Sequence, residues 1–246
     1  MPAASAVSPS SAPAAPAAAP SPVDPAHVAA VDALFGAVRP TGADAAAALA
    51  AMRASWRGSE TALVGDGAQI AARHPDFFAR LEATVVPCRG VVFELGPSVG
   101  LVTRWIAAEE SVTRVLAADV DPLASAVLRA ARLPKTTVLD ARDFDPRRLP
   151  PIDTLALCET IEHLTTRDER ALLARLAPAL SRRTRYVIST PIGFLEDPTH
   201  VRGFSKTQFV EHVEGLYGPL ESIDYRSGYS QVAVGRLERL GLPYRG

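Results

Sequence analysis

From residue 90 onward the sequence alternates between short apolar runs and amphipathic stretches, and this alternation limits the possible folds more than any other feature. The runs that predict strands are residues 91–94, 115–118, 136–139, 153–157 and 186–189. The stretches that predict helices are residues 101–109, 123–132, 167–180 and 206–214. We therefore expect an α/β fold with a doubly wound, mostly parallel sheet. Residues 221–225 and 231–236 predict an antiparallel pair at one edge of that sheet.

The region before residue 85 has a different composition. Residues 1–25 contain seven prolines and nine alanines but only one charged residue, Asp24, so we expect a disordered Ala/Pro-rich tail. Apolar side chains then recur at helical spacing, and the last predicted helix, at residues 76–84, places Phe77, Phe78 and Leu81 on one face. We expect residues 26–84 to form a helical cap that either completes the core or forms a lid over a substrate pocket. Residues 85–246 would form the main domain.

Charge and cysteine content exclude several classes of protein. Lys and Arg number 26 against 27 Asp and Glu, a net charge of −1, so a nucleic-acid binder is not favoured. No apolar run approaches the roughly 20 residues needed to span a bilayer, so we expect no membrane partner. Cys88 and Cys158 are far apart in the sequence and form no metal-binding or redox motif. This cysteine usage favours a reducing, cytoplasmic location.

A turn of small residues follows the first predicted strand, in the pattern Glu94-x-Gly96-x-Ser98-x-Gly100. In an open parallel sheet, ligands bind at the carboxyl ends of the strands. Carboxylates stand at two more of these ends, Asp119 after the second strand and Asp140 after the third. A carboxylate such as Asp119 can accept hydrogen bonds from both ribose hydroxyls of a nucleoside. Asp121 is a rival for that role, but because Pro122 follows it, the N-cap of a helix suits it better.

Two carboxylates and an imidazole follow the fourth strand, in the pattern Glu159-x-x-Glu162-His163. If residues 159–163 form one helical turn, the three side chains project from one face. Like charges brought together cost energy unless a proton or a cation lies between them. His200 follows the fifth strand and could complete a site of two glutamates and two histidines for a divalent ion. Such mixed ligands suit Mn²⁺, Fe²⁺, Co²⁺ or Zn²⁺ better than Mg²⁺.

The glycine turn resembles motif I of the class I S-adenosylmethionine (SAM) methyltransferases, with Ser98 in place of its middle glycine. The resemblance covers roughly residues 85–236 and implies a Rossmann-like fold in which SAM is the cofactor. In this family the carboxylate matched by Asp140 receives the adenine amino group, and the next backbone amide faces the ring. The residues that the resemblance implies for SAM binding are Glu94, Gly96, Ser98, Gly100, Asp119, Asp140, Ala141 and Cys158.

The Glu-x-x-Glu-His turn with a later histidine resembles two groups within that family. One comprises the ubiquinone-pathway O-methyltransferases and their relatives, which implies O-methylation of a small-molecule acceptor with His163 and Glu159 as catalytic residues. His163 then acts as a ligand, with Glu159, Glu162 and His200, of Mn²⁺, Mg²⁺, Co²⁺ or Zn²⁺. Without a metal, His163 either acts as a general base or only lines the pocket.

The other group comprises the small-RNA 3′-end 2′-O-methyltransferases, in which those four positions hold the metal. An RNA acceptor needs a cationic route for its phosphates. The arginines that could form one are Arg142, Arg147, Arg148, Arg182, Arg183 and Arg185, although solvated surface is the simpler interpretation. An alternative of another class is a SAM-binding or partner subunit without catalytic activity.

Overall fold

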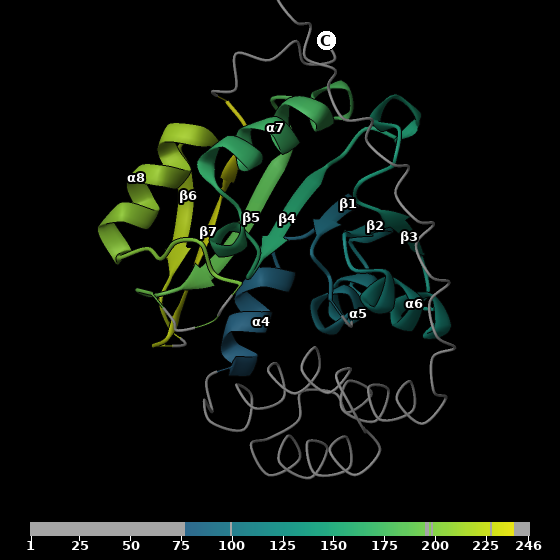
Figure 1. Ribbon diagram of the computed structural model, residues 1–246, viewed down its shortest axis with the longest axis horizontal. Coiled ribbons are helices and arrows are strands. Elements are labelled where there is room, and N and C mark those ends of the chain that lie inside the picture. The colour runs from purple at the N-terminus through teal and green to yellow at the C-terminus, as the bar shows by residue number, and fades with distance from the viewer. Residues whose placement is uncertain (1–76, 99, 195–196, 198, 227, 239–246) are drawn as a thin grey trace, which may run out of the picture.

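The computed structural model describes residues 77–98, 100–194, 197, 199–226 and 228–238. In this part of the chain seven strands form one sheet in the order β3-β2-β1-β4-β5-β7-β6 (Figure 1). Strands β1 to β5 are parallel, whereas β7 runs antiparallel to both β5 and β6. The predicted doubly wound, mostly parallel sheet and its antiparallel edge pair are therefore confirmed.

The strands are β1 (Gly90–Leu95), β2 (Val112–Asp119), β3 (Thr136–Asp140), β4 (Thr154–Cys158), β5 (Arg185–Pro191), β6 (Leu220–Asp224) and β7 (Ser230–Arg236). The helices are α4 (Phe77–Val85), α5 (Leu101–Ala108), α6 (Pro122–Ala130), α7 (Thr166–Leu176) and α8 (Lys206–Leu216). Three 3₁₀ turns are η1 (Pro146–Arg148), η2 (Ile161–His163) and η3 (Ala177–Ala179). The single helix predicted for residues 167–180 is wrong, since α7 ends at Leu176 and η3 follows. Pro178 explains the break, because proline has no backbone N–H and its ring clashes with the preceding turn.

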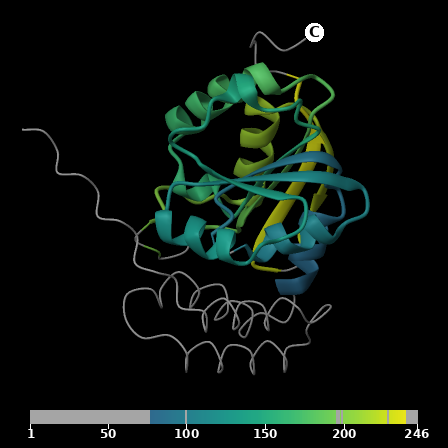
Figure 2. The same ribbon diagram turned by 90° about the vertical axis from the view of Figure 1, so that its right-hand side faces the viewer.

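Helices cover both faces of the sheet, as Figure 2 shows. Helices α4, α5 and α6 pack on one face, where Leu81, Ile106 and Leu128 are fully buried. Helices α7 and α8 pack on the other face, where Leu173 and Phe209 are fully buried. Strands β1, β2, β4, β5 and β7 contribute buried apolar side chains to both faces, which explains the continuous apolar runs in the sequence.

Helix α4 is the described part of the predicted cap, and it agrees with the helix predicted at residues 76–84. It contacts α5, β5 and β7, so it lies on the sheet face beside α5 (Figure 1). The expected tail at residues 1–25 and the rest of the cap before residue 77 lie outside the described residues. Among the described helices, none has the length and apolar character needed to cross a bilayer.

The strand order places the carboxyl ends of β3, β2, β1, β4 and β5 side by side. The chain runs from β1 outward through β2 to β3, and then returns to β4 on the other side of β1. The register pairs Asp119 with Asp140, and Leu95 with both Ala118 and Leu157. This reversal beside β1 is the topological switch point, outside which open α/β sheets bind their ligands.

Candidate functional site

The turn between β1 and α5 has a backbone that requires small residues. Gly96, Ser98 and Gly100 have φ values of 70°, 52° and 89°, a region that glycine adopts without strain. A Cβ at Gly100 would lie 2.3 Å from Leu128 Cδ1, and one at Gly96 would lie 3.0 Å from Thr160 Oγ1. The predicted glycine turn therefore lies at the switch point, and Ser98 holds a left-handed conformation there at some cost in energy.

The Asp119 carboxylate, at the end of β2, is hydrogen-bonded to the backbone of this turn. Its Oδ2 accepts a hydrogen bond from Ser98 N at 2.9 Å, and its Oδ1 accepts one from Asp121 N at 2.8 Å. Asp121 has the helix-capping position, since its carbonyl accepts Ser125 N at 3.0 Å in the first turn of α6. Asp121 thus stands at the N-cap position of α6, and Asp119 is the carboxylate that faces the turn.

Glu94 is a buried carboxylate below the same turn, with 1% of its surface exposed. Its Oε2 has no hydrogen-bond partner among the described residues. Burial raises the pKa of Glu94 to about 7, and the nearby charge of Asp119 adds to the effect. Glu94 thus lies buried at the end of β1, with one carboxyl oxygen that no described residue contacts by a hydrogen bond.

Without a ligand, the folded protein is expected to lose stability as the pH rises from about 4.5 to about 7, because folded Glu94 keeps a proton that the unfolded chain releases. The Glu94→Gln variant removes this titration and should be more stable than wild type at pH 8, by at most about 3 kcal/mol. Thermal unfolding between pH 5 and pH 8 measures the effect. Glu110→Gln, at an exposed position, is the control. Equal pH slopes for wild type and Glu94→Gln would contradict the assignment.

The Asp140 side chain, at the end of β3, is held by Arg142. Hydrogen bonds from the Arg142 guanidinium and backbone amide lower the pKa of Asp140 to about 2. The amide of Ala141 donates to Asp119 O at 2.9 Å and so extends the ladder between β2 and β3. We expected this amide to face a bound adenine ring. In the structure it instead donates its hydrogen bond to the neighbouring strand β2.

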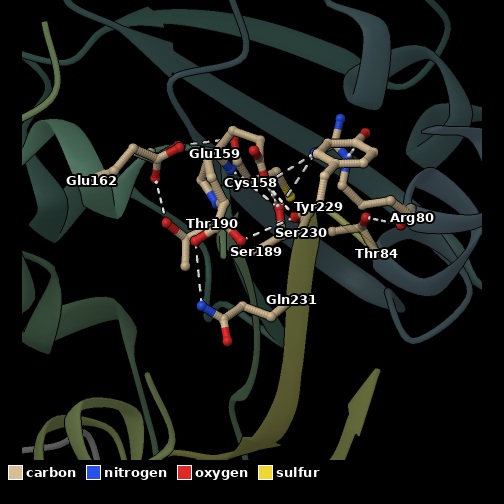
Figure 3. Close-up of polar contacts among 12 residues, drawn as sticks. Arg80, Thr84, Cys158, Glu159, Glu162, Ser189, Thr190, Tyr229, Ser230 and Gln231 are labelled. Atoms are coloured by element: carbon tan, nitrogen blue, oxygen red, sulfur yellow. Dashed lines mark hydrogen bonds and ion pairs between the residues drawn. The ribbon is translucent and has the colours of Figure 1, made fainter. Parts of the chain in front are cut away.

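The helical turn considered for residues 159–163 is not what the structure shows. The 3₁₀ turn η2 begins only at Ile161, and Glu159 precedes it with a φ of 50°. The Glu159 Oε1 atom instead accepts hydrogen bonds from Ser189 Oγ at 2.8 Å and from Ser230 Oγ at 2.9 Å. It also forms an ion pair with Arg80 Nη1 at 3.2 Å (Figure 3). The left-handed backbone thus turns this carboxylate toward α4, β5 and β7.

Glu162, His163 and His200 form a separate cluster, in which one potential ligand atom of each lies within 4.8 Å of the others. Glu162 is buried, and its Oε2 accepts Thr190 Oγ1 at 3.1 Å (Figure 3). The rings of His163 and His200 meet edge to face, with their centroids 4.7 Å apart. The structure therefore brings together three of the four predicted metal ligands, and Arg80 holds the fourth, Glu159.

Burial sets the protonation states of Glu162 and His163 in this cluster, because it favours the neutral form of each side chain. Burial raises the pKa of Glu162 well above its usual value, and the charge of Glu159 adds to the effect. Burial and the neighbouring His200 lower the pKa of His163, which is therefore neutral near pH 7. His163 Nδ1 lies 3.2 Å from Thr199 O, a carbonyl that can only accept, so Nδ1 carries the proton. The Nε2 lone pair is left for a proton or a metal ion.

The sequence patterns did not predict three of the residues that the structure places at the site: Arg80, Thr160 and Val120. Arg80 comes from the predicted cap, and Thr160 donates to Leu95 O at 2.9 Å, which ties the end of β1 to the end of β4. Val120, after Asp119, is 61% exposed, an unusual exposure for an apolar residue at a strand end. Cys158 is the last residue of β4, one residue past the end of the predicted strand. It is buried, and burial raises the pKa of its thiol. No local pattern marks Arg80, whose partners are distant in sequence.

No family model matches the sequence, and no curated protein was found to be related to it. Solved structures do match. A TehB-like SAM-dependent methyltransferase from Corynebacterium glutamicum is 18% identical with a TM-score of 0.53, over 73% of this chain and 98% of that one. The protein has the fold of the class I SAM-dependent methyltransferases.

Two further structures have the same methyltransferase fold. A candidate type 11 methyltransferase from Sulfolobus solfataricus is 16% identical with a TM-score of 0.50, over 65% of this chain and 92% of that one. A chain from the complex between the Haloferax volcanii Trm112 methyltransferase activator and a candidate methyltransferase is 15% identical. Its TM-score is 0.54, over 75% of this chain and 100% of that one. Since one fold can support different activities, these matches establish the architecture, whereas the acceptor depends on the residues of the site.

Proposed function

We propose that the protein transfers a methyl group from SAM to a hydroxyl oxygen of a small-molecule acceptor. The observation that carries the proposal is the 2.9 Å hydrogen bond from Ser98 N to Asp119 Oδ2. It joins the glycine turn and the ribose-binding carboxylate into one site at the switch point of a methyltransferase fold. The balanced net charge of −1 favours a small acceptor over a polyanionic RNA.

The residues at this edge fit SAM. The unpartnered Oε2 of Glu94 suits the cationic amino group of the ligand, and Asp119 can accept the ribose hydroxyls. Asp140 stands one strand farther along, in register with Asp119, where the adenine would extend. The exposed side chain of Val120 offers an apolar contact for the flat ring.

The acceptor would be deprotonated by His163, whose Nε2 carries the lone pair. Bound SAM supplies a methyl group on a sulfonium sulfur, an already activated donor. The acceptor oxygen would take the methyl group from the sulfur, S-adenosylhomocysteine would be the leaving group, and His163 would take the acceptor proton. A neutral imidazole suits a hydroxyl acceptor, because a hydroxyl must lose its proton during the transfer. The contacts of Glu159 described above all go to Oε1, which leaves Oε2 to orient the acceptor.

A metal-assisted form of the same reaction uses the cluster differently. One carboxylate and two imidazoles suit Mn²⁺, Co²⁺ or Zn²⁺, and Glu162, His163 and His200 would hold the ion. The Thr199 carbonyl would orient the His163 ring, as an outer partner commonly does. The ion would lower the pKa of the acceptor hydroxyl. Glu159 would have to leave Arg80 to become a fourth ligand.

Calorimetry with S-adenosylhomocysteine tests the proposed cofactor site. Asp119→Ala is expected to weaken binding about tenfold or more, because hydrogen bonds to a charged group are lost. Asp121→Ala is the matched control, since it removes a neighbouring carboxylate at the start of α6 and should leave the affinity within about twofold. Unchanged affinity in Asp119→Ala would place the ribose elsewhere, and a wild-type protein that binds neither SAM nor S-adenosylhomocysteine would contradict the proposed function.

A further inference from the structure

The Asp140 carboxylate accepts three hydrogen bonds from Arg142, two positions farther along the chain. Arg142 Nε donates to Oδ1 at 3.0 Å, and Arg142 Nη2 donates to Oδ2 at 2.9 Å. The backbone amide of Arg142 also donates to Oδ1, at 2.9 Å. Two parallel bonds from a planar guanidinium fix the rotation of a carboxylate as well as its position.

These three donors leave the two carboxylate oxygens unequal. Oδ1 already accepts two hydrogen bonds, whereas Oδ2 accepts one and keeps an acceptor position in the carboxylate plane. The Asp140 side chain is 41% exposed, so a ligand can reach that position. Because an ionised carboxylate can only accept, Oδ2 can bind an N–H or O–H group but is repelled by a carbonyl oxygen.

The backbone of the same turn is fixed from the other side by Arg175 of α7. Its Nη1 donates to Ala141 O at 2.8 Å, and its Nη2 donates to Phe144 O at 2.6 Å. The guanidinium also lies 4.2 Å from the centroid of the Phe144 ring. The turn that follows β3 is thus held in place independently of Arg142, and the Arg142 fork sets only the orientation of the Asp140 carboxylate.

We propose that Arg142 is a positioning residue that presents Oδ2 of Asp140 to the exocyclic amino group of adenine. The site then selects a 6-aminopurine cofactor over its 6-oxopurine analogue. This inference rests on the proposed function, since it assumes that SAM binds along the ends of β1, β2 and β3. The selectivity then depends on the two hydrogen bonds from the Arg142 guanidinium as well as on Asp140. Without them, the Asp140 carboxylate could rotate away from the adenine ring or accept hydrogen bonds from other donors.

The test compares two ligands on the full chain by calorimetry, S-adenosylhomocysteine and its 6-oxo analogue S-inosylhomocysteine. Wild type is expected to prefer the amino form by about tenfold or more, because the analogue places an acceptor against an acceptor. In Arg142→Ala the affinity for S-adenosylhomocysteine should fall about fivefold and the preference should shrink to about threefold or less. Arg142→Lys should behave like Arg142→Ala, since an ammonium group keeps the charge but not the fork.

Arg148→Ala is the matched control. This arginine lies in the next turn, is 88% exposed and pairs with Asp145 at 3.5 Å, so its removal deletes the same charge without touching Asp140. Its affinities and preference should equal those of wild type. A full preference in Arg142→Lys would assign the effect to charge alone and overturn the inference, as would a full preference in Arg142→Ala. If wild type binds neither ligand, the proposed function itself fails, which is a distinct result.

Discussion

Replacing Glu169 by alanine is expected to lower the free energy of unfolding by roughly 3–5 kcal/mol. Glu169 lies on α7 with no exposed surface, and its carboxylate accepts hydrogen bonds from Arg202, His212 and Tyr217. Removing it leaves a guanidinium and a phenol without their shared partner in the core. Chemical denaturation gives the free energy directly, and the melting temperature should fall by about 10 °C or more.

This network also fastens the loop that contains His200. Arg202 Nε donates to Ile161 O at 3.0 Å, and Arg202 Nη1 donates to Thr166 Oγ1 at 3.0 Å. One residue earlier, Val201 N donates to Glu162 O at 2.9 Å. The loop after β5 is therefore held against η2 and α7, which brings His200 to Glu162 and His163.

Burial acts to raise the pKa of Glu169, but the hydrogen bonds from His212 and Arg202 outweigh it and keep the pKa below its usual value. Because the folded pKa is depressed, the network stabilises the protein at neutral pH, and this contribution is lost as the pH falls through that pKa. Arg170→Ala, at an exposed position next to Glu169, is the control and should change stability by less than about 0.5 kcal/mol. A loss in Glu169→Ala no larger than the control's would contradict the role of the network.

Replacing His163 by alanine is expected to lower the rate of methyl transfer by roughly 10²–10⁴-fold. The reason is the loss of the Nε2 lone pair that takes the acceptor proton. The measurement is the rate of S-adenosylhomocysteine formation with an acceptor found by screening. The affinity for S-adenosylhomocysteine should stay at the wild-type value, because the proposed cofactor carboxylates Glu94, Asp119 and Asp140 lie on β1, β2 and β3. This affinity also verifies that the variant is folded.

Two further measurements separate a metal-free base from a metal ligand. For a free base, added imidazole should restore part of the rate of His163→Ala, and EDTA should leave wild type unaffected. For a metal ion, EDTA should abolish activity, Mn²⁺ or Co²⁺ should restore it, and Glu162→Gln and His200→Ala should be as impaired as His163→Ala, since ligands act as a unit. Full activity in EDTA with a wild-type rate for His200→Ala would rule out the metal-assisted form. A wild-type rate for His163→Ala would contradict both forms.

The order of strands and helices could be predicted from the sequence because the signal is local. A strand buried on both faces reads as a short apolar run, and a helix on a sheet reads as a 3.6-residue periodicity. The positions of Gly96, Asp119 and Asp140 followed for the same reason, since each lies directly after a strand and parallel strands end at one edge. The break at Pro178 was also a local signal, although the apolar periodicity that continues through it concealed it.

By itself, the sequence determined the sheet, the glycine turn and the line of carboxylates along it, all of which depend on neighbouring residues. Only the tertiary structure decided how the Glu-x-x-Glu-His segment divides. Glu159 turns to Arg80, whereas Glu162 and His163 meet His200. These partners come from α4 and from the loop after β5, and long-range pairing of this kind leaves no periodicity in the chain. The left-handed backbone at Glu159 shows the physical reason, because the contacts of its carboxylate across three elements outweigh its local conformational preference.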